Sequence, residues 1–262
     1  MRLQSRPARF LFSAMLMTSV AATLGGCKTT AMSEATGSIG NRSSQAEVDP
    51  RRAVEVYGER YRANPKNADA ALQYGQALRS SGQRAQAVAV LEQASIANPG
   101  NKALLAAYGR ALADNGSFQR GFDVLSSAHS PDNPDWRLLS VQGTCMDNLG
   151  RHDEARRYYD AALKIAPEEP SVLSNLGLSY VLSKQLPQAE QVLRRAYANP
   201  NADARVRNNL ALAVGLQGRF AEAESIARTG LPPEEAAANV AYLKQMLDRK
   251  GGPRFDQDAA RS

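Results

Sequence analysis

Cysteine, histidine and aromatic residues are scarce in this chain. Its 262 residues include two Cys, two His and one Trp, and aromatic residues make up 6%. Two cysteines exclude a disulfide-dense scaffold. Beyond residues 1–26 no stretch is apolar enough to enter a membrane, which excludes a multi-spanning protein. The remaining balance, 43% hydrophobic and 22% charged, excludes a collagen-like or wholly disordered chain.

Sequence patterns of catalysis are also missing. The chain has no P-loop, no GxGxxG fingerprint and no GxSxG, HExxH or CxxC motif. His129 and His152 fit structural or surface positions, and Cys145 fits a small buried residue on a helix. The pairs Glu168-Glu169 and Glu234-Glu235 suit helix starts, where carboxylates complement the helix dipole. We therefore expect no enzyme, no metal site, no cofactor and no small-molecule substrate.

Alanine is the residue in excess, with 44 copies. Alanine has the highest helix propensity and a side chain small enough for helices to approach closely. An alanine-rich, aromatic-poor chain therefore predicts an all-α fold of closely packed helices.

The N-terminus has the pattern of an export signal. A basic stretch with three arginines precedes an apolar segment, residues 10–24, which is shorter than the roughly 20 residues that span a bilayer. The segment ends in Leu24-Gly25-Gly26-Cys27, which resembles the bacterial lipobox. We expect cleavage after residue 26 and lipid on Cys27, because two or more acyl chains anchor a protein stably. An uncleaved anchor or an ordinary signal with a nearby cysteine are the alternatives.

Lipidation predicts a location and changes the charge. Lys28 follows the cysteine, where an Asp tends to retain lipoproteins in the inner membrane, so the periplasmic face of the outer membrane is favoured. Removing residues 1–26 removes three arginines and lowers the net charge from +6 to +3. That excess is too small to indicate nucleic-acid binding. Residues 27–48 are rich in Ser, Thr and Gly without apolar periodicity, which predicts a flexible tether.

Small residues recur every 34 residues through the body of the chain. The first series lies at Gly75, Gly109, Gly143 and Gly177 and continues at Ala211. A second series is Gly82, Gly116 and Gly150, which Lys184 interrupts and Gly218 resumes. Two further series are Ala87, Gly121, Ala155, Ala189 and Ala223, and Ala94, Ala128, Ala162, Ala196 and Gly230. A 34-residue period with small residues at helix crossings resembles the tetratricopeptide (TPR) repeat.

The resemblance implies a right-handed superhelical solenoid over residues 49–250. Five repeats of two helices, A and B, are expected at 68–101, 102–135, 136–169, 170–203 and 204–237. Asp49-Pro50 begins a lone B helix that reaches about Ala63, which makes an N-terminal half repeat. A final helix opens at Pro232-Pro233 and caps the last repeat, since repeat arrays otherwise expose core at their ends. Residues 251–262 are expected to be a disordered tail.

In TPR arrays the A helices form a concave surface that accepts an extended peptide. Asn175 and Asn209 share one position in neighbouring repeats, and their amides offer donors and an acceptor to a peptide backbone. Arginines add positive charge to the same face. The expected groove residues are Gln73, Arg79, Arg110, Arg137, Asn175, Arg205 and Asn209. The alternatives are that asparagine is simply common at this position of the TPR consensus, and that the arginines are solvated surface residues.

After the last repeat, the run Leu-Pro-Pro-Glu-Glu-Ala-Ala-Ala-Asn-Val-Ala-Tyr-Leu at 231–243 departs from TPR consensus. It resembles the C-terminal segment of the TadD family, the TPR lipoproteins of tight-adherence (Flp) pilus systems. The lipobox, tether and half repeat fit the same family. The resemblance implies an outer-membrane scaffold that assists assembly of a type IVb-like pilus secretion machine, with a pilotin-like role toward the secretin. Another envelope TPR lipoprotein, either a pilotin of a different secretion system or an adaptor for peptidoglycan enzymes, is the alternative.

Overall fold

The computed structural model describes residues 50–130 and 132–249. The predicted signal peptide (1–26), the lipidated Cys27 with the tether (27–48), Asp49 and the tail (251–262) lie outside the described residues. The chain divides into two units after Gln45, and the second unit, Ala46–Ser262, holds all the described residues.

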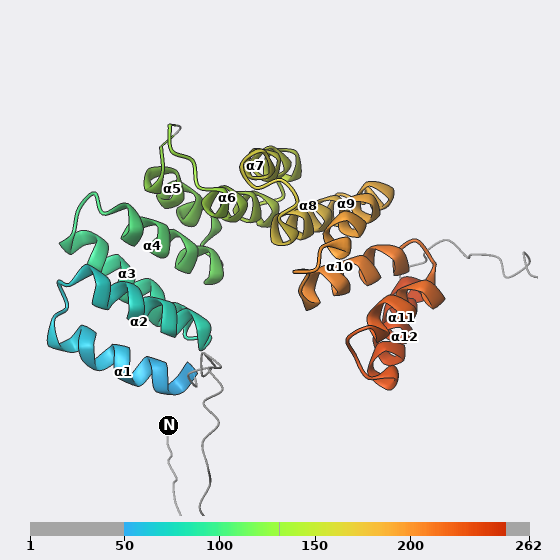
Figure 1. Cartoon of the computed structure of the whole chain (residues 1–262), viewed down its shortest axis with the longest axis horizontal. Helices are drawn as coiled ribbons and strands as arrows, with labels where there is room; N and C mark the ends of the chain where they lie inside the picture. The colour runs from blue at the N-terminus through green and yellow to red at the C-terminus, as the bar shows by residue number, and fades with distance from the viewer. Residues whose placement is uncertain (1–49, 131, 250–262) are drawn as a thin grey trace, which may run out of the picture. The chain divides into compact units, whose positions relative to one another are not determined.

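The described residues form twelve helices and no strand, which confirms the all-α prediction (Figure 1). An isolated bridge between Ser130 and Asn133 is the one extended pairing among them. The helices are α1 (Pro50–Ala63), α2 (Ala68–Ser80), α3 (Arg84–Ala97), α4 (Lys102–Asp114), α5 (Phe118–Ala128), α6 (Trp136–Asn148), α7 (His152–Ile165), α8 (Pro170–Leu182), α9 (Leu186–Ala198), α10 (Ala204–Gly215), α11 (Phe220–Arg228) and α12 (Pro233–Arg249).

The 34-residue period governs where the helices begin. The A helices α2, α4, α6, α8 and α10 begin at residues 68, 102, 136, 170 and 204, and the B helices α3, α5, α7, α9 and α11 at 84, 118, 152, 186 and 220. Both series advance by 34 residues, and α1 begins 34 residues before α3. The helix starts therefore follow the register predicted from the small residues.

Each A helix has a side-chain cap. The residue before it accepts a hydrogen bond from a backbone N–H of the first turn, as Asn67 does from Ala70 at 2.9 Å. This satisfies donors that a helix N-terminus leaves unpaired. The capping residues, again 34 apart, are Asn67, Asn101, Asp135, Glu169 and Asp203. Glu169 thus acts at a helix start, as its sequence position predicted.

The turn from each A helix to its B helix needs a left-handed residue. Gly82, Gly116, Gly150 and Gly218 have φ between 76° and 84° there. Lys184 occupies the same place in the fourth pair, with φ of 61°. A side chain with a Cβ resists this conformation, so the turn between α8 and α9 is strained.

Within a pair, the helices cross at glycine. A Cβ added at Gly143 would lie 2.5 Å from the ring of Tyr159 in the facing B helix, closer than side chains can approach. Gly75, Gly109 and Gly177 face Leu91, Leu125 and Leu193 in the same manner. Glycine at the crossing therefore makes room for a large side chain on the partner helix. The predicted close approach is confirmed.

The last pair is built differently from the other four. Its A helix has Ala211 at the glycine position, and its B helix has Ala227 where the others have Leu or Tyr. A Cβ at Gly215 would lie 2.6 Å from Leu243 of α12, so the large side chain at this end comes from α12. Val240, also of α12, packs against the core cluster that includes Val214 of α10 and Ala223 of α11. The predicted covering role of α12 is confirmed for Leu243 and Val240.

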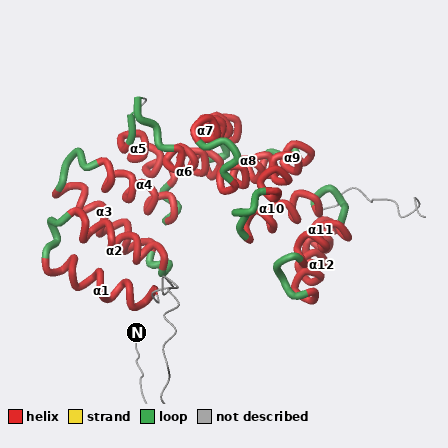
Figure 2. The backbone as a smooth tube through the Cα atoms, viewed as in Figure 1, coloured by secondary structure: helices red, strands yellow, loops and turns green. Residues whose placement is uncertain are grey.

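The A helices form one continuous row. In the described part of the chain α2 contacts α4, and the contacts continue through α6, α8 and α10 to α12, whereas no B helix contacts the B helix of the next pair. The A helices are therefore more closely spaced than the B helices. Their row forms one surface, called here the A-helix face (Figure 2).

Candidate functional site

Two predicted groove residues, Asn175 and Asn209, lie on the A-helix face and bridge neighbouring A helices. Asn175 Nδ2 donates to Ser140 Oγ at 3.1 Å, and Asn209 Nδ2 donates to Ser174 Oγ at 3.0 Å. Both serines are nearly fully buried, with 6% and 3% exposure. Each asparagine therefore reaches back 35 residues and is held in place by the preceding A helix.

The bridges leave part of each amide available. Asn175 and Asn209 are half-buried, and no residue in 50–130 or 132–249 hydrogen-bonds to either carbonyl Oδ1. A primary amide can both accept from and donate to a peptide backbone. The two side chains thus present oriented acceptors one repeat apart, which is the arrangement that a peptide clamp requires.

Arg79 and Arg110 lie around a hollow of about 410 Å³ between α2 and α4. Arg79 Nε donates to Asp114 Oδ2 at 2.6 Å, and this ion pair neutralises its charge. Arg110 forms no hydrogen bond or ion pair with any described residue. Burial lowers the pKa of Arg110 from its ordinary value. Arg110 is thus the predicted arginine whose guanidinium is free to bind a partner's acceptor.

The other two predicted arginines lie beside helix caps. Arg137 packs over the Trp136 ring at 4.4 Å and lies 4.0 Å from its own N-cap, Asp135. Arg205 Nε donates to its own N-cap, Asp203, at 2.9 Å. Both guanidiniums are exposed and paired with an exposed carboxylate. Such exposed ion pairs add little to stability, and they partly neutralise the positive charge that the sequence predicted for this face.

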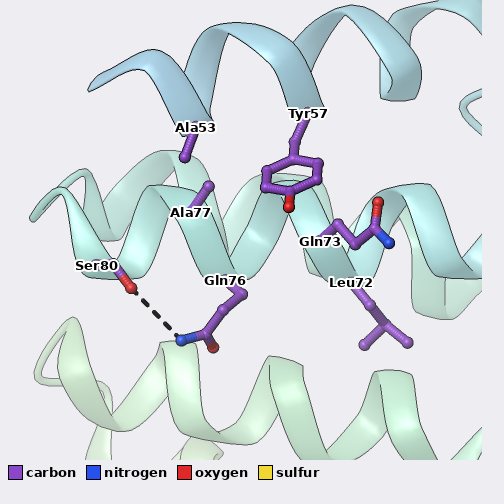
Figure 3. A pocket seen from close by; sticks show the side chains of 7 residues that line it. All are labelled: Ala53, Tyr57, Leu72, Gln73, Gln76, Ala77 and Ser80. Atoms are coloured by element: carbon purple, nitrogen blue, oxygen red, sulfur yellow. Dashed lines mark hydrogen bonds between the residues drawn. The ribbon is translucent and has the colours of Figure 1, made fainter. Parts of the chain in front are cut away.

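Gln73 lies in a second hollow, of about 440 Å³, between α1 and α2 (Figure 3). The sequence register aligns it with Asn175 and Asn209, but α2 has no described A helix before it. The structure therefore brings Arg79 and Arg110 together at one hollow, Asn175 and Asn209 along one row, and leaves Gln73 at the N-terminal end of the face.

A buried carboxylate that the sequence did not single out joins three helices at the middle of the array. Asp147 of α6, 8% exposed, accepts from Tyr159 Oη at 2.9 Å and Ser179 Oγ at 2.7 Å. His152 Nδ1 lies 2.8 Å from the same carboxylate. Burial, followed by the charge of Asp147, raises the pKa of the Tyr159 hydroxyl. His152 therefore has the structural position that the sequence favoured.

His129 is also a structural residue, as the C-cap of α5. Its Nε2 lies 3.1 Å from Gln142 Oε1, and Gln142 Nε2 donates to Ser126 Oγ at 2.9 Å. This chain of contacts joins α5 to α6 after a helix three residues shorter than α3 or α7. The early end of α5 therefore makes this pair shorter than its neighbours.

Cys145 is fully buried in α6, as predicted. Burial, with a smaller effect from the charge of Asp114, raises the pKa of its thiol to about 11. The thiol is therefore protonated at neutral pH and is a poor nucleophile.

Among residues 50–130 and 132–249 no cluster of three or more acidic, His or Cys side chains is arranged to hold a metal ion. No helix in the same part of the chain has the length and apolar character needed to cross a bilayer.

Three family models match the chain, each described as a tetratricopeptide repeat. They cover residues 45–111, 147–204 and 204–229. No curated protein sequence matches.

Solved structures share the fold at low identity. PilW, a widely conserved type IV pilus biogenesis factor, aligns with a TM-score of 0.63 and 20% identity, over 74% of this chain and 91% of its own. TTC0263, a thermophilic TPR protein of Thermus thermophilus, aligns with a TM-score of 0.59 and 20% identity, over 68% of this chain and 100% of its own. A chain of the APC/C hetero-tetramer Cut9–Hcn1 aligns with a TM-score of 0.63 and 15% identity. The alignment covers 79% of this chain but only 41% of that chain. At these identities the likeness concerns the fold alone.

Proposed function

Since the chain is an array of tetratricopeptide repeats, we propose that it is a non-enzymatic scaffold whose A-helix face binds a segment of a partner protein. The partner belongs to a tight-adherence (Flp) pilus secretion machine, and lipid on Cys27 holds the scaffold at the periplasmic face of the outer membrane. Within this machine the scaffold acts on the secretin, in the manner of a pilotin.

The proposal rests on polar groups of the A-helix face that have no partner among the described residues. Asn175 and Asn209 are fixed by buried serines, yet each keeps a carbonyl oxygen without a partner in the described part of the chain. Arg110 adds an unpaired guanidinium beside a hollow. Preorganised groups lose little conformational entropy when a ligand binds, so a surface of this kind suits an extended peptide.

Two observations support a pilus system over other envelope machines. The sequence at 231–243 resembles the TadD family, and this segment forms the first part of α12, which closes the array. The fold is also similar to that of PilW, a pilus biogenesis factor. The first observation concerns sequence and the second concerns fold alone, so a genetic test is needed.

Deletion of the gene is the decisive experiment. We expect surface pili to be lost and secretin multimers to decrease, with both restored by the wild-type gene. Normal pili in the deletion strain would refute the assignment to a pilus. Neighbouring genes for a Flp pilin, a secretin and a secretion ATPase would support it independently.

Anchoring is tested by Cys27→Ser. The variant should lose labelling by a palmitate analogue and leave the outer-membrane fraction, because no thiol remains to form the thioether. Cys145→Ser is the matched control and should label normally. Labelling that persists in Cys27→Ser would contradict the lipid anchor.

The groove is tested by replacing Asn175 and Asn209 with Ala. Capture of pilus components from detergent-solubilised envelopes should fall because two oriented acceptors are lost. Asn208→Ala, which changes an exposed asparagine of α10, is the control. Equal capture by the double variant and the control would remove these asparagines from the site.

A further inference from the structure

The first described helix, α1, is a B helix, and no described A helix precedes it. In the 34-residue register its Ala53 and Tyr57 correspond to Ala87 and Leu91 of α3. Ala87 and Leu91 have no exposed surface, and Leu91 packs at Gly75 of α2. Ala53 and Tyr57 are half-buried. Among the described residues, therefore, no A helix covers this surface of α1 as one covers the matching surface of α3.

This open surface is the hollow of about 440 Å³ between α1 and α2. Figure 3 shows Ala53 and Tyr57 extending from α1 toward α2, where Ala77 and Gln73 face them. The apolar lining is bordered by amide and hydroxyl groups of Gln73, Gln76 and Ser80. The row of contacting A helices also stops here, at α2. The next place in that row is the hollow itself.

We propose that the hollow is a docking site for an α-helix of another protein, which takes the place that an A helix occupies before every other B helix of the described chain. The occupant continues an existing interface, because each A helix already packs against its neighbour in the row and against a B helix. The proposal deepens the proposed function, since it names the form and chemistry of one partner segment, and it rests on that function only for the identity of the machine.

The structure specifies the residue that must lie over Tyr57. The described pair in which a tyrosine occupies this place is α6–α7, where Tyr159 faces Gly143. A Cβ at Gly143 would lie 2.5 Å from that ring, so only glycine fits. The docking helix therefore needs a glycine at this crossing.

A second position follows from Gln73. Asn175 and Asn209, at the corresponding place in later A helices, donate to Ser140 and Ser174 of the helix before. Each serine lies three residues before a crossing glycine, Gly143 or Gly177. A hydroxyl at this position would accept from the Gln73 amide. The docking helix is thus expected to carry Ser-x-x-Gly or Thr-x-x-Gly on an apolar face.

The chain's own preceding sequence fits this pattern poorly. In the register Ser38 falls at the hydroxyl position, but Asn41 falls where glycine is required. Gly37 and Gly40 would lie inside such a helix, and each costs about 1 kcal/mol relative to alanine. A helix from a partner meets the requirement without these penalties.

A synthetic peptide of residues 135–150 of this chain is the probe, with Cys145 replaced by Ala and a fluorophore attached. It carries Ser140 and Gly143, which already pack beside a tyrosine. Fluorescence anisotropy with the full chain should show saturable binding. The peptide with Gly143→Leu should bind at least tenfold more weakly, because the added side chain meets the Tyr57 ring.

Variants of the protein locate the binding. Ala53→Arg fills the hollow and should weaken peptide binding at least tenfold. Ala89→Arg, which makes the same change at an exposed alanine of α3, should bind as the wild type does. Circular dichroism checks that both variants keep their helix content. Equal binding of the two peptides, equal binding by the two variants, or no saturable binding would overturn the proposal.

Photocrosslinking in cells identifies the occupant. Benzoylphenylalanine at Gln76, which is exposed at the edge of the hollow, should crosslink to a Ser/Thr-x-x-Gly helix of a different protein, and Ala53→Arg should abolish the product. Crosslinks to residues 28–48 of the same chain, or to a second copy, would overturn it. The deletion strain tests the pilus assignment separately. If the deletion abolishes pili but the crosslink joins residues of the same chain, only the docking helix is refuted. If the deletion leaves pili normal but the crosslink joins a partner helix, only the pilus assignment is refuted.

Discussion

The two ends of the helical array are completed in opposite ways. At the C-terminal end α12 places Leu243 at Gly215 of α10, and Ala236 is fully buried. At the N-terminal end Tyr57 and Ala53 of α1 are half-buried beside a hollow. The C-terminal end is therefore covered by α12, whereas no described helix covers the N-terminal end. A repeat array needs its end faces covered, which is why we propose that a partner helix adds contacts at the N-terminal end.

The closed end should be the more sensitive to a charged substitution, and this is the largest effect that we expect. Leu243→Asp places a carboxylate against the crossing at Gly215 and should lower the free energy of unfolding by about 3 kcal/mol. Tyr57→Asp at the open end should cost less than about 1 kcal/mol, because Tyr57 borders a hollow whereas Leu243, although also half-buried, packs directly against Gly215. Urea denaturation measures both values. Similar losses would contradict the contrast between the ends.

A turn in the interior of the array should respond in the opposite direction. Lys184→Gly relieves the left-handed strain between α8 and α9 and should raise the free energy of unfolding by about 1 kcal/mol. Gly150→Lys makes the reverse change at the equivalent turn and should lower it by a similar amount. Thermal unfolding followed by circular dichroism compares them. A lower midpoint for Lys184→Gly would show that Lys184 has stabilising contacts that outweigh the strain.

Acid should weaken the closed end before the open one, through Glu190 of α9. Burial alone would raise the pKa of this carboxyl, but hydrogen bonds from Gln217, Arg194 and Arg219 outweigh burial and lower it. A lowered pKa gives stability that is complete above the ordinary value near 4.5 and is lost as pH falls through the folded-state pKa.

Glu190→Gln tests this ionic network. The variant should be less stable than the wild type by about 1 kcal/mol at pH 7, and the difference should shrink as pH falls below the ordinary value of 4.5 and through the lowered folded-state pKa. Urea denaturation at several pH values measures it, and hydrogen exchange in α10 and α11 shows whether the loss is local. A difference that is constant with pH would mean that ionisation of Glu190 is not involved.

Cys145 is remote from both ends, and its substitution is not needed to probe the middle of the array. Because burial raises the pKa of its thiol to about 11, iodoacetamide should alkylate the native protein at least 100-fold more slowly than the urea-unfolded protein. Mass spectrometry follows the reaction. Rapid alkylation of the native state would show that α6 opens locally, and it would place a weak point in the middle of the array.

The sequence predicted the register well because glycine and alanine report steric limits that hold in every repeat. Gly143 must be small whatever else surrounds it, and Gly150 must accept a positive φ. Lys184 was recognised as the exception in that series, and it adopts the same conformation at a cost in strain. Short-range constraints of this kind are visible in one chain without its partners.

Side-chain partners on the A-helix face could not be predicted in the same way. The sequence placed Arg79 on that face as free charge, but Asp114, 35 residues later, pairs with it. Asn175 similarly donates to Ser140 on the preceding A helix, α6. These contacts depend on how neighbouring repeats are rotated against one another, and the spacing of small residues sets that rotation only approximately. Asp147 was missed because its position near a helix end suggests exposure, although its carboxylate is buried.

The hydrogen-bonded Asp147 has a mechanical consequence for the array. Packed apolar contacts let neighbouring helices slide by small amounts, whereas a carboxylate held by donors on α7 and α8 fixes distance and direction together. Sliding α7 or α8 along α6 would therefore stretch a hydrogen bond to Asp147, so this carboxylate resists relative movement of the three helices.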